Sequence, residues 1–328
     1  MIITRTPFRI SLAGGGTDFK NFFSKEDGKV ISFTIDKYIY VMVKRQIGIV
    51  DYKYKISWSQ IEYCNKIDDI KHPIVRETLK YFKIDYPIEI STYADVPSQT
   101  GLGSSSAFAV GLVNAIYSLQ NKQVTKYQIA KVASEIEIDI LKRPMGKQDH
   151  YACCYGNVNT LTFKKHEVEI SPVFYSKNFL ECINNNFFLI YTKIRRDSSK
   201  VLKKQVDVNL MQTQILLKMK DQVNEILDVI NKDKNFFKIG SILDQGWKLK
   251  KKISSKITSS KIENYYKKLK TNGAIGGKLL GAGGGGFLLI QVNKNKKKKV
   301  LNSVKNLHIL DFKLDTSGTR VTYYDNSF

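Results

Sequence analysis

The chain has few cysteines and no long hydrophobic run. Its 328 residues include four cysteines, none in a CxxC spacing: Cys64, Cys153, Cys154 and Cys182. They are too few for a disulfide framework in a chain of this length, so we expect reduced thiols in a cytoplasmic protein. No stretch approaches the roughly 18 consecutive apolar residues that a membrane helix needs. No apolar segment follows a basic N-terminus, so neither secretion nor membrane attachment is expected.

Acidic residues are also scarce relative to basic ones. The chain carries 53 Lys and Arg against 30 Asp and Glu, a formal net charge of +23. Such a charge raises the possibility of a nucleic-acid partner. The lysines are spread along the chain, however, and no aromatic-rich strand typical of RNA-binding domains accompanies them. The dense run 294–299 is interpreted as a solvated surface loop, so we expect phosphate-bearing small molecules, not nucleic acid, as ligands.

No internal repeat or low-complexity linker divides the chain. Its hydrophobic patterns predict strands and helices that alternate in the first half, followed by a second α+β unit. We place the domains at 1–183 and 184–328. Strands are expected at 2–4, 9–12, 30–43, 53–58, 88–92, 157–163, 167–170, 187–191, 276–280, 287–292 and 319–323, and helices at 108–119, 125–141, 198–231, 239–252 and 260–269.

The segment from Asp95 to Ala107, DVPSQTGLGSSSA, lies between a predicted strand and a predicted helix. Two glycines allow close approach of the backbone, and three serines stand where the helix begins. Unpaired N–H groups and the positive end of the helix dipole make such a position an anion site. The chain has no GxxxxGK[ST], and a GxGxxG from Gly101 ends on Ser106. The alternative is a serine N-cap after a glycine turn.

Two further segments are rich in glycine. Arg5–Asp18 runs from a strand into three consecutive glycines, and Asp18 offers a carboxylate suited to sugar hydroxyls. Its alternative interpretation is a glycine turn capped by Asp. In Gly273–Phe287, eight of fifteen residues are glycine. Because glycine there costs backbone entropy, close approach to a ligand or another loop explains it better than a linker does.

Two charged segments complete the candidates. Asp149 lies in Arg143–His150, predicted as a compact loop, and taken alone it would be a surface ion-pair residue beside Lys147. Arg195 and Arg196 precede Asp-Ser-Ser, an arrangement that binds phosphate well when a helix starts there. A solvated arginine pair next to a serine cap explains the same pattern.

The ordered set of motifs resembles the GHMP small-molecule kinases across essentially the whole chain. Pro97–Ala107 resembles the signature of that family, Arg5–Asp18 its first motif and Gly273–Phe287 its third. The form RxPFRISxAGGGTD followed by GKQD is most similar to bacterial sugar-1-kinases such as the D-glycero-D-manno-heptose 7-phosphate kinases. The resemblance implies an α+β, two-domain fold. The N-terminal domain would be like domain 2 of ribosomal protein S5 and the C-terminal domain ferredoxin-like.

The resemblance also implies roles for individual residues. Asp149 would be the catalytic base and Arg9 the cation that keeps it ionised. Mg²⁺ would be held by Ser105 and Glu137; helical periodicity does not separate Glu137 from Asp139, but the spacing to GKQD favours Glu137. The residues expected to bind ATP are Gly101, Leu102, Gly103, Ser104, Ser105 and Ser106. Those expected to bind substrate are Gly15, Gly16, Thr17, Asp18, Arg195 and Arg196. Support of the phosphate loop is expected from Gly281, Gly283, Gly284 and Gly285.

Two positions depart from the family pattern. His150 stands where Gln is usual, and Ser106 replaces a common Ala. Both changes lie beside the expected site and leave its proposed phosphate, metal and base groups in place.

The expected reaction is ATP-dependent phosphorylation of the anomeric hydroxyl of a sugar. D-glycero-D-manno-heptose 7-phosphate, converted to the 1,7-bisphosphate for nucleotide-heptose and surface-polysaccharide synthesis, is the expected substrate. The alternatives are a kinase for another sugar such as fucose, or a non-catalytic sugar-sensing or RNA-binding relative. The sequence reveals neither the anomer nor the oligomeric state.

Overall fold

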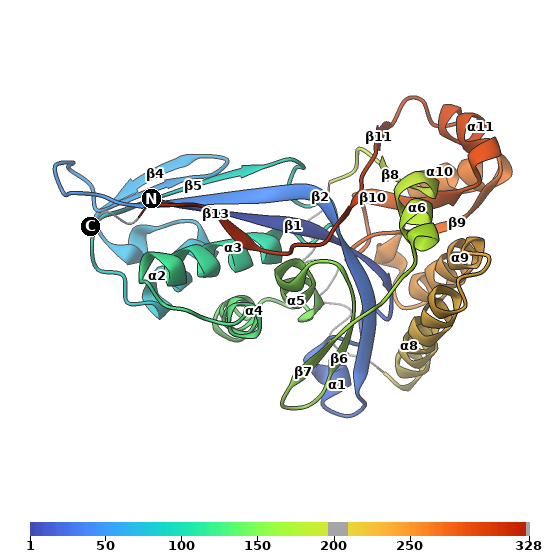
Figure 1. Ribbon diagram of the computed structural model, residues 1–328, viewed down its shortest axis with the longest axis horizontal. Coiled ribbons are helices and arrows are strands. Elements are labelled where there is room, and N and C mark those ends of the chain that lie inside the picture. The colour runs from blue at the N-terminus through green and yellow to red at the C-terminus, as the bar shows by residue number, and fades with distance from the viewer. Residues whose placement is uncertain (196–208, 326–328) are drawn as a thin grey trace.

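The computed structural model describes residues 1–195 and 209–325 and shows two bodies joined side by side (Figure 1). The first is built on a large, mainly antiparallel sheet ordered β13-β1-β2-β5-β3-β4, with β6, β7 and β12 attached through β2. Its strands are β1 Ile2–Ala13, β2 Gly28–Arg45, β3 Tyr54–Ser57, β4 Ile61–Cys64, β5 Ile88–Ala94, β6 Val158–Phe163, β7 Val168–Pro172, β12 Leu314–Asp315 and β13 Arg320–Tyr324. The length of β2 lets its first half pair with β6 and its second half with β5.

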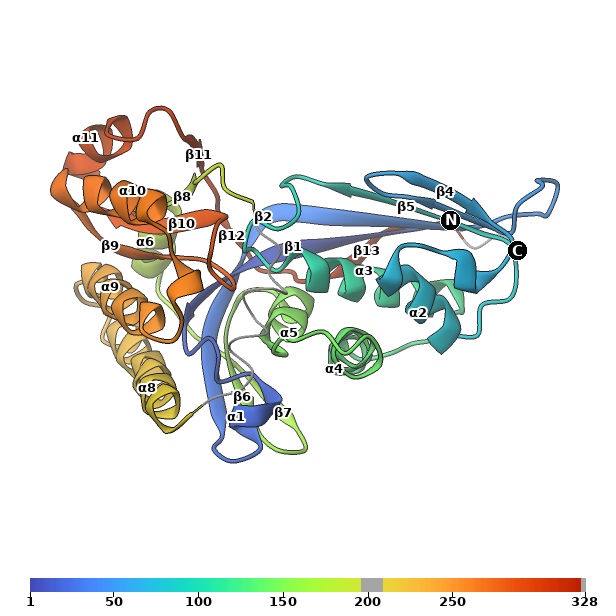
Figure 2. The same ribbon diagram turned by 180° about the vertical axis from the view of Figure 1, so that it is seen from behind.

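Helices cover one face of this sheet (Figures 1 and 2). The central helix α3 is buried on almost every side, because most of its residues are small or apolar, and it packs against β1 and β2. The helices of the first body are α1 Lys20–Phe23, α2 Pro73–Tyr81, α3 Ser104–Leu119, α4 Lys126–Ser134 and α5 Gln148–Tyr155.

The second body contains a smaller antiparallel sheet ordered β11-β8-β10-β9 in the described residues. Its strands are β8 Phe187–Tyr191, β9 Ala274–Leu279, β10 Phe287–Val292 and β11 His308–Leu310, and its helices are α6 Lys177–Asn186, α8 Leu210–Asn231, α9 Phe237–Lys251, α10 Ser260–Thr271 and α11 Lys297–Asn302. Strand β10 is buried along its whole length. Its alternate side chains enter two cores, one shared with α10 and one continuous with the first body.

The chain returns to the first body at its C-terminal end. Residues 319–323 were expected to complete the second unit, but β13 pairs antiparallel with β1 of the large sheet. Hydrogen bonding at a free edge of β1 outweighs proximity in sequence here. The division of the chain at 183/184 remains a prediction, and we propose that the segment carrying β12 and β13 belongs structurally with the first body.

Several elements differ from the expected ones. The predicted helix 125–141 is α4, capped by Thr125, followed by a π-helical turn at Glu135–Ile140. The expected loop around Asp149 is the start of α5. The lysine run 294–299 lies in a short 3-10 turn and in α11. The expected helix 198–231 is described only from Leu210, because residues 196–208 lie outside the described part.

All four cysteines are free thiols. Within residues 1–195 and 209–325, no helix combines the length and apolarity that crossing a membrane requires.

Candidate active site

The three glycine-containing segments, far apart in sequence, meet around a cavity of about 590 Å³ between the two bodies. The first body supplies the strand β1, the phosphate loop before α3 and the start of α5. The second body supplies the end of α9 and the glycine-rich turn after β9. The predicted site residues on its wall are Arg9, Gly15, Gly16, Asp18, Gly101, Gly103, Ser104, Ser105, Ser106, Asp149, Gly281, Gly283 and Gly285.

The loop before α3 has the backbone of an anion site. Gly103 is the residue before the helix, with a left-handed φ of 78°, and no side chain caps the helix. The alternative interpretation of a serine N-cap therefore does not hold. The hydroxyl of Ser106 is buried and has no hydrogen-bond partner among the described residues. The N–H groups of the first helical turn, which have no partner within the helix, and the hydroxyl of Ser106 thus lie at the cavity wall, where an anionic group is favoured.

The third glycine segment packs directly against this loop. A Cβ on Gly101 would approach the carbonyl oxygen of Leu280 to 2.6 Å, and a Cβ on Gly281 would approach Cα of Gly101 equally closely. The N–H of Phe287 donates to the carbonyl of Thr100 at 3.1 Å. The backbone of the second body therefore touches the phosphate loop, and only glycine fits at the contact.

Arg9 and Asp149 form a bidentate pair inside the cavity. Nε and Nη2 of Arg9 donate to the two carboxylate oxygens of Asp149, each at 2.7 Å, and Nη1 donates to the carbonyl of Gly101 at 2.8 Å. The two side chains are 4% and 16% exposed. Asp149 is therefore not the surface ion-pair residue that its local sequence suggested, and its partner is Arg9, not Lys147.

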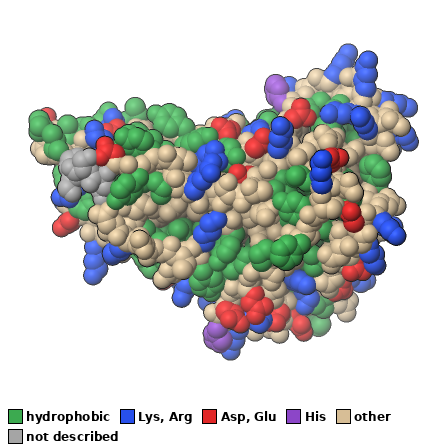
Figure 3. Space-filling view, in the orientation of Figure 1, with side chains coloured by type: hydrophobic (Ala, Val, Ile, Leu, Met, Phe, Trp, Pro, Cys, Tyr) green, Lys and Arg blue, Asp and Glu red, His purple; other side chains and the backbone are tan. Residues whose placement is uncertain are grey.

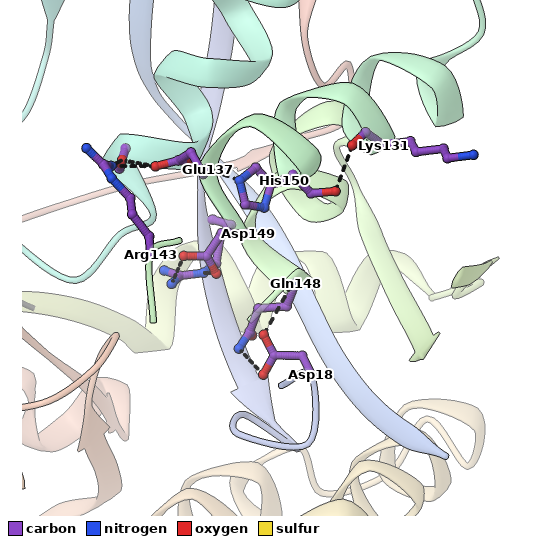
Figure 4. A network of polar contacts seen from close by, with 10 residues as sticks. Asp18, Lys131, Glu137, Arg143, Gln148, Asp149 and His150 are labelled. Atoms are coloured by element: carbon purple, nitrogen blue, oxygen red, sulfur yellow. Dashed lines mark hydrogen bonds and ion pairs between the residues drawn. The ribbon is translucent and has the colours of Figure 1, made fainter. Parts of the chain in front are cut away.

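Asp18 lies beside this pair, next to Gln148 (Figure 4). Its carboxylate accepts hydrogen bonds from the backbone N–H groups of Gly16 and Gln148 and from Nε2 of Gln148. Burial, and then the charge of Asp149, raise the pKa of Asp18 above its usual range, although the backbone donors act in the opposite direction. Gly146 is essential to this arrangement, because a Cβ there would lie 2.0 Å from Oδ2 of Asp18.

Glu137 is directed inward by the π-helical turn. It is fully buried, whereas Asp139 on the same turn is exposed. Glu137 contacts the hydroxyl of Ser105, and its other oxygen lies 2.9 Å from Nε2 of the buried His150. Burial raises the pKa of Glu137, but its contacts with His150, Arg143 and Ser105 outweigh burial and hold the pKa below its usual range. The geometry thus separates the two acidic residues that periodicity left undecided.

The donor set at Ser105 and Glu137 fits a divalent cation that also binds phosphate. Mg²⁺ sites of this kind commonly use one or two carboxylates together with substrate phosphates. In the structure, Nη1 of Arg143 donates to both oxygens, at 2.7 Å to Ser105 and 2.6 Å to Glu137. A cation is therefore already favoured at this point, and a metal ion would take the place of the guanidinium. The described residues contain no group of three or more His, Cys, Asp or Glu side chains that could hold a metal alone.

Five of the predicted residues that the structure describes do not line the cavity, and one of them is Glu137, which lies behind Ser105 of the wall. Thr17 is buried, and its hydroxyl donates to the carbonyls of Gly14 in its own loop and of Lys29 in β2. Leu102 is also buried, with its carbonyl accepting from the N–H of Arg9. Gly284 bonds through its N–H to Ile257. Arg195 is exposed and lies near the hydroxyl of Tyr191. Arg196 lies outside the described residues.

Several residues on the cavity wall were not among the predicted site residues. Arg143 was quoted only as part of a segment. Trp58, His72 and Phe108 form an aromatic end of the cavity, with the His72 ring centroid 4.9 Å from both of the others. Burial, and then the charge of Arg143, lower the pKa of His72 to about 4, so its ring is neutral at pH 7. These side chains converge only in the folded chain, and no local pattern marks them.

Family models place the chain in a known class of protein. The model for the N-terminal domain of GHMP kinases matches residues 71–157, and that for the C-terminal domain matches residues 220–309. The chain belongs to the GHMP kinase family and has the two-domain α+β fold of that family.

Individual relatives cover nearly the whole chain. It is 30% identical to the D-glycero-alpha-D-manno-heptose 7-phosphate kinase of Campylobacter jejuni, over 97% of this chain and 98% of that protein. A solved putative sugar kinase from Campylobacter jejuni is similar with a TM-score of 0.77 and 28% identity, over 98% and 97% of the two chains. A D-glycero-D-manno-heptose 1-phosphate kinase from Bacteroides thetaiotaomicron has a TM-score of 0.81 at 20% identity, over 99% and 100%, which shows the common fold.

Proposed function

We propose that the chain is an ATP-dependent sugar kinase that phosphorylates an anomeric hydroxyl, with D-glycero-D-manno-heptose 7-phosphate as its substrate. The observation that carries this proposal is the bidentate Arg9–Asp149 pair, which lies beside Asp18 and against the phosphate loop. The 30% identical heptose 7-phosphate kinase supports the choice of sugar. The product would be the 1,7-bisphosphate, a precursor for nucleotide-heptose synthesis.

Each part of the cavity suits one part of the two substrates. The aromatic end around Trp58 and His72 can take a planar base. The start of α3 can bind the phosphates through backbone N–H groups and serine hydroxyls. Mg²⁺ bound between Ser105 and Glu137 would neutralise charge on the phosphate oxygens. Asp18, with Gly15 and Gly16 beside it, can accept hydrogen bonds from sugar hydroxyls.

The chemistry then requires one proton transfer and one phosphoryl transfer. Asp149 takes the proton of the anomeric hydroxyl, that oxygen forms a bond to the γ-phosphorus, and the bond from phosphorus to the bridging oxygen breaks to release ADP. Arg9 holds the Asp149 carboxylate in place through two hydrogen bonds. An anomeric hydroxyl is more acidic than other sugar hydroxyls, so a carboxylate is a sufficient base.

The substitution Asp149→Asn tests the role of the base. Asn keeps the size of the side chain and loses the proton acceptor, so turnover should fall by about 10²–10⁴. The dissociation constant for ATP should change little, because Asp149 does not form the phosphate loop. Asp139→Asn, an exposed change nearby, is the matched control. Turnover that survives in Asp149→Asn would make Asp149 a structural partner of Arg9.

A panel of sugars tests the substrate. ADP release should be measured with heptose 7-phosphate, the unphosphorylated heptose and fucose. Strong preference for heptose 7-phosphate is expected. Equal use of the phosphorylated and unphosphorylated heptose would contradict the proposed substrate but not a kinase. ADP release with none of the sugars, despite ATP binding, would favour a non-catalytic relative.

A further inference from the structure

Two lysines of the second body reach the same cavity and have no role in the proposed reaction so far. Lys278, in β9, is 7% exposed, and its amine donates to the carbonyl of Leu12 at 3.0 Å. Lys250, at the end of α9, is half-buried, and its amine donates to the carbonyl of Gly281. Both side chains line the cavity wall.

The charges around these amines are not balanced. Among residues 1–195 and 209–325, neither amine has a carboxylate oxygen within ion-pair distance. Burial, followed by the charges of Lys250 and Arg9, lowers the pKa of Lys278 well below its usual range. Burial and then Arg9 lower the pKa of Lys250 to about 8, against the weaker opposing effects of Asp18 and Asp149. Asp149 is already paired with Arg9, and Asp18, whose carboxylate accepts from Gly16 and Gln148, is not within ion-pair distance of either amine.

A purely structural role does not explain this arrangement. Each amine has three N–H donors, of which the structure shows one bonded to a backbone carbonyl. A neutral side chain could donate a hydrogen bond to the same carbonyl without the free-energy cost of burying a charge. A buried cation that faces a cavity is accounted for if an anion enters the cavity and pairs with it.

The positions of the two amines indicate which ligand groups they would meet. The partner of Lys250, Gly281, packs against Gly101 of the phosphate loop. The partner of Lys278, Leu12, leads into the loop that carries Gly15, Gly16 and Asp18. The two amines therefore lie where the phosphate loop and the sugar loop meet the second body.

We propose that Lys250 and Lys278, together with Arg9, form a phosphoryl-binding site on the second body of the protein. This inference rests on the proposed function and extends it by assigning a phosphate-bearing group to this side of the cavity. That group comes either from the γ-phosphate of ATP or from the phosphate of the sugar substrate. With Arg195 exposed and outside the cavity wall, these lysines are better placed than the predicted arginine for an anionic ligand.

Binding measurements on four variants test the site. The variants are Lys250→Met, Lys278→Met, Lys278→Gln, which keeps an N–H donor for Leu12, and Lys252→Met, an exposed control two residues after Lys250. Calorimetry would give dissociation constants for ADP, for β,γ-imido-ATP, for heptose 7-phosphate and for the unphosphorylated heptose. Loss of one charge-assisted contact should weaken binding by about 10- to 100-fold.

The ligand that weakens identifies the source of the phosphoryl group. If the lysine variants bind imido-ATP more weakly than the wild type but bind ADP equally well, the site is assigned to the γ-phosphate. If they bind heptose 7-phosphate more weakly but bind the unphosphorylated heptose equally well, the site is assigned to the phosphate of the sugar. The inference is overturned if Lys250→Met, Lys278→Met and Lys278→Gln all bind the four ligands as tightly as the control Lys252→Met does. A lower melting temperature of these variants would not change that conclusion, because the lysines would then serve only to hydrogen-bond the two carbonyls.

Failure of the proposed function would look different. A wild-type protein that binds neither imido-ATP nor heptose 7-phosphate would contradict the function. In that case inorganic tripolyphosphate is the probe for the site. Binding to the wild type that is lost in Lys278→Gln supports the site, and equal binding to both overturns it.

Discussion

Arg143 places a guanidinium between the two oxygen atoms that we propose as metal ligands. It donates to Ser105 at 2.7 Å and to Glu137 at 2.6 Å, and its side chain is 30% exposed. A metal ion and this guanidinium cannot occupy the same point. Arg143 therefore acts as a competing cation, which stabilises Glu137 when no metal is bound and has to be displaced when one arrives.

Replacing Arg143 with Met should strengthen divalent-cation binding. We expect the dissociation constant of Mn²⁺, measured by electron paramagnetic resonance with ADP present, to fall by about three- to tenfold. The change is no larger because the Arg143 side chain is partly exposed, and solvent weakens its contact with the proposed metal ligands. Glu137→Gln should raise it, and Asp139→Asn, on the exposed side of the same turn, should leave it unchanged. Weaker Mn²⁺ binding in Arg143→Met would show that Arg143 assists the metal or the phosphates directly.

At the scale of elements, the contact between the phosphate loop and the turn after β9 joins the two bodies at the site. Gly281 has a φ of 67°, and a Cβ there would meet Cα of Gly101 at 2.6 Å. Lys250 donates to the carbonyl of the same residue. A change at Gly281 is thus transmitted to the backbone that we propose to bind ATP.

The substitution Gly281→Ala should reduce both stability and nucleotide binding. Overpacking together with an unfavourable φ should cost about 1–3 kcal/mol in the free energy of unfolding, measured by denaturant titration. The dissociation constant for imido-ATP should rise by roughly tenfold or more, since the loop has to shift. Gly48→Ala is the matched control, because Gly48 also has a positive φ, of 80°, but nothing lies near its Cβ position. If the two substitutions changed the free energy of unfolding and imido-ATP binding equally, the positive φ of Gly281, and not its contact with Gly101, would account for the effect.

Elements with a single strong pattern could be predicted from the sequence. Strands β8 and β10 have the expected bounds, because each is a short apolar run ended by polar residues. Helix α5 was missed, since it is buried between α3, α4 and the sheet and shows no amphipathic stripe. The π-helical turn shifts the periodicity after Ser134, which is why the apolar Ile140, near the end of the predicted helix 125–141, is 41% exposed.

The candidate site was predictable only in part, for a similar reason. The segments around Gly101 and Asp18 were recognised from their glycines, serines and carboxylate, whereas the expected role of Asp149 came from the resemblance to a family. Arg143, Lys250 and Lys278 carry no local pattern, and their importance comes from three elements that meet in the folded chain. The pairing of Arg9 with Asp149 likewise depends on tertiary structure, because 140 residues separate them.

At the scale of the whole molecule, charge and chain path both bear on function. Figure 3 shows basic side chains scattered among acidic ones on this face, with a gathering of basic side chains, which the sequence gives as lysines, over α11 at the upper right. The residues 294–296, 298 and 299 of the lysine run are exposed, as expected for a solvated segment. The basic groups that matter for the proposed reaction are instead the few inside the cavity.

The return of the chain to the first body adds contacts to the N-terminal part of β1 and to the middle of β2. Phe312 is 3% exposed, and the carboxylate of Asp315 accepts from the hydroxyl of Tyr38 at 3.0 Å. Thr319 and Thr6 share a buried hydrogen bond at 2.8 Å. The first body therefore depends on residues that come after the second body in the sequence.

Removing residues 312–328 should consequently destabilise the first body, although the predicted N-terminal domain stays intact in sequence. The loss of Phe312 from the core alone should cost about 3–5 kcal/mol, and exposure of the edge of β1 adds to it. Thermal unfolding of the full chain and of the truncated chain measures the effect. Thr319→Val gives a finer test: it should cost about 1–3 kcal/mol by leaving Thr6 unpaired, while Thr322→Val, at an exposed position of the adjoining strand β13, should cost under about 0.5 kcal/mol. A truncated chain that melts like the full one would show that the first body does not depend on residues 312–328, and it would contradict our placement of β12 and β13 in that body.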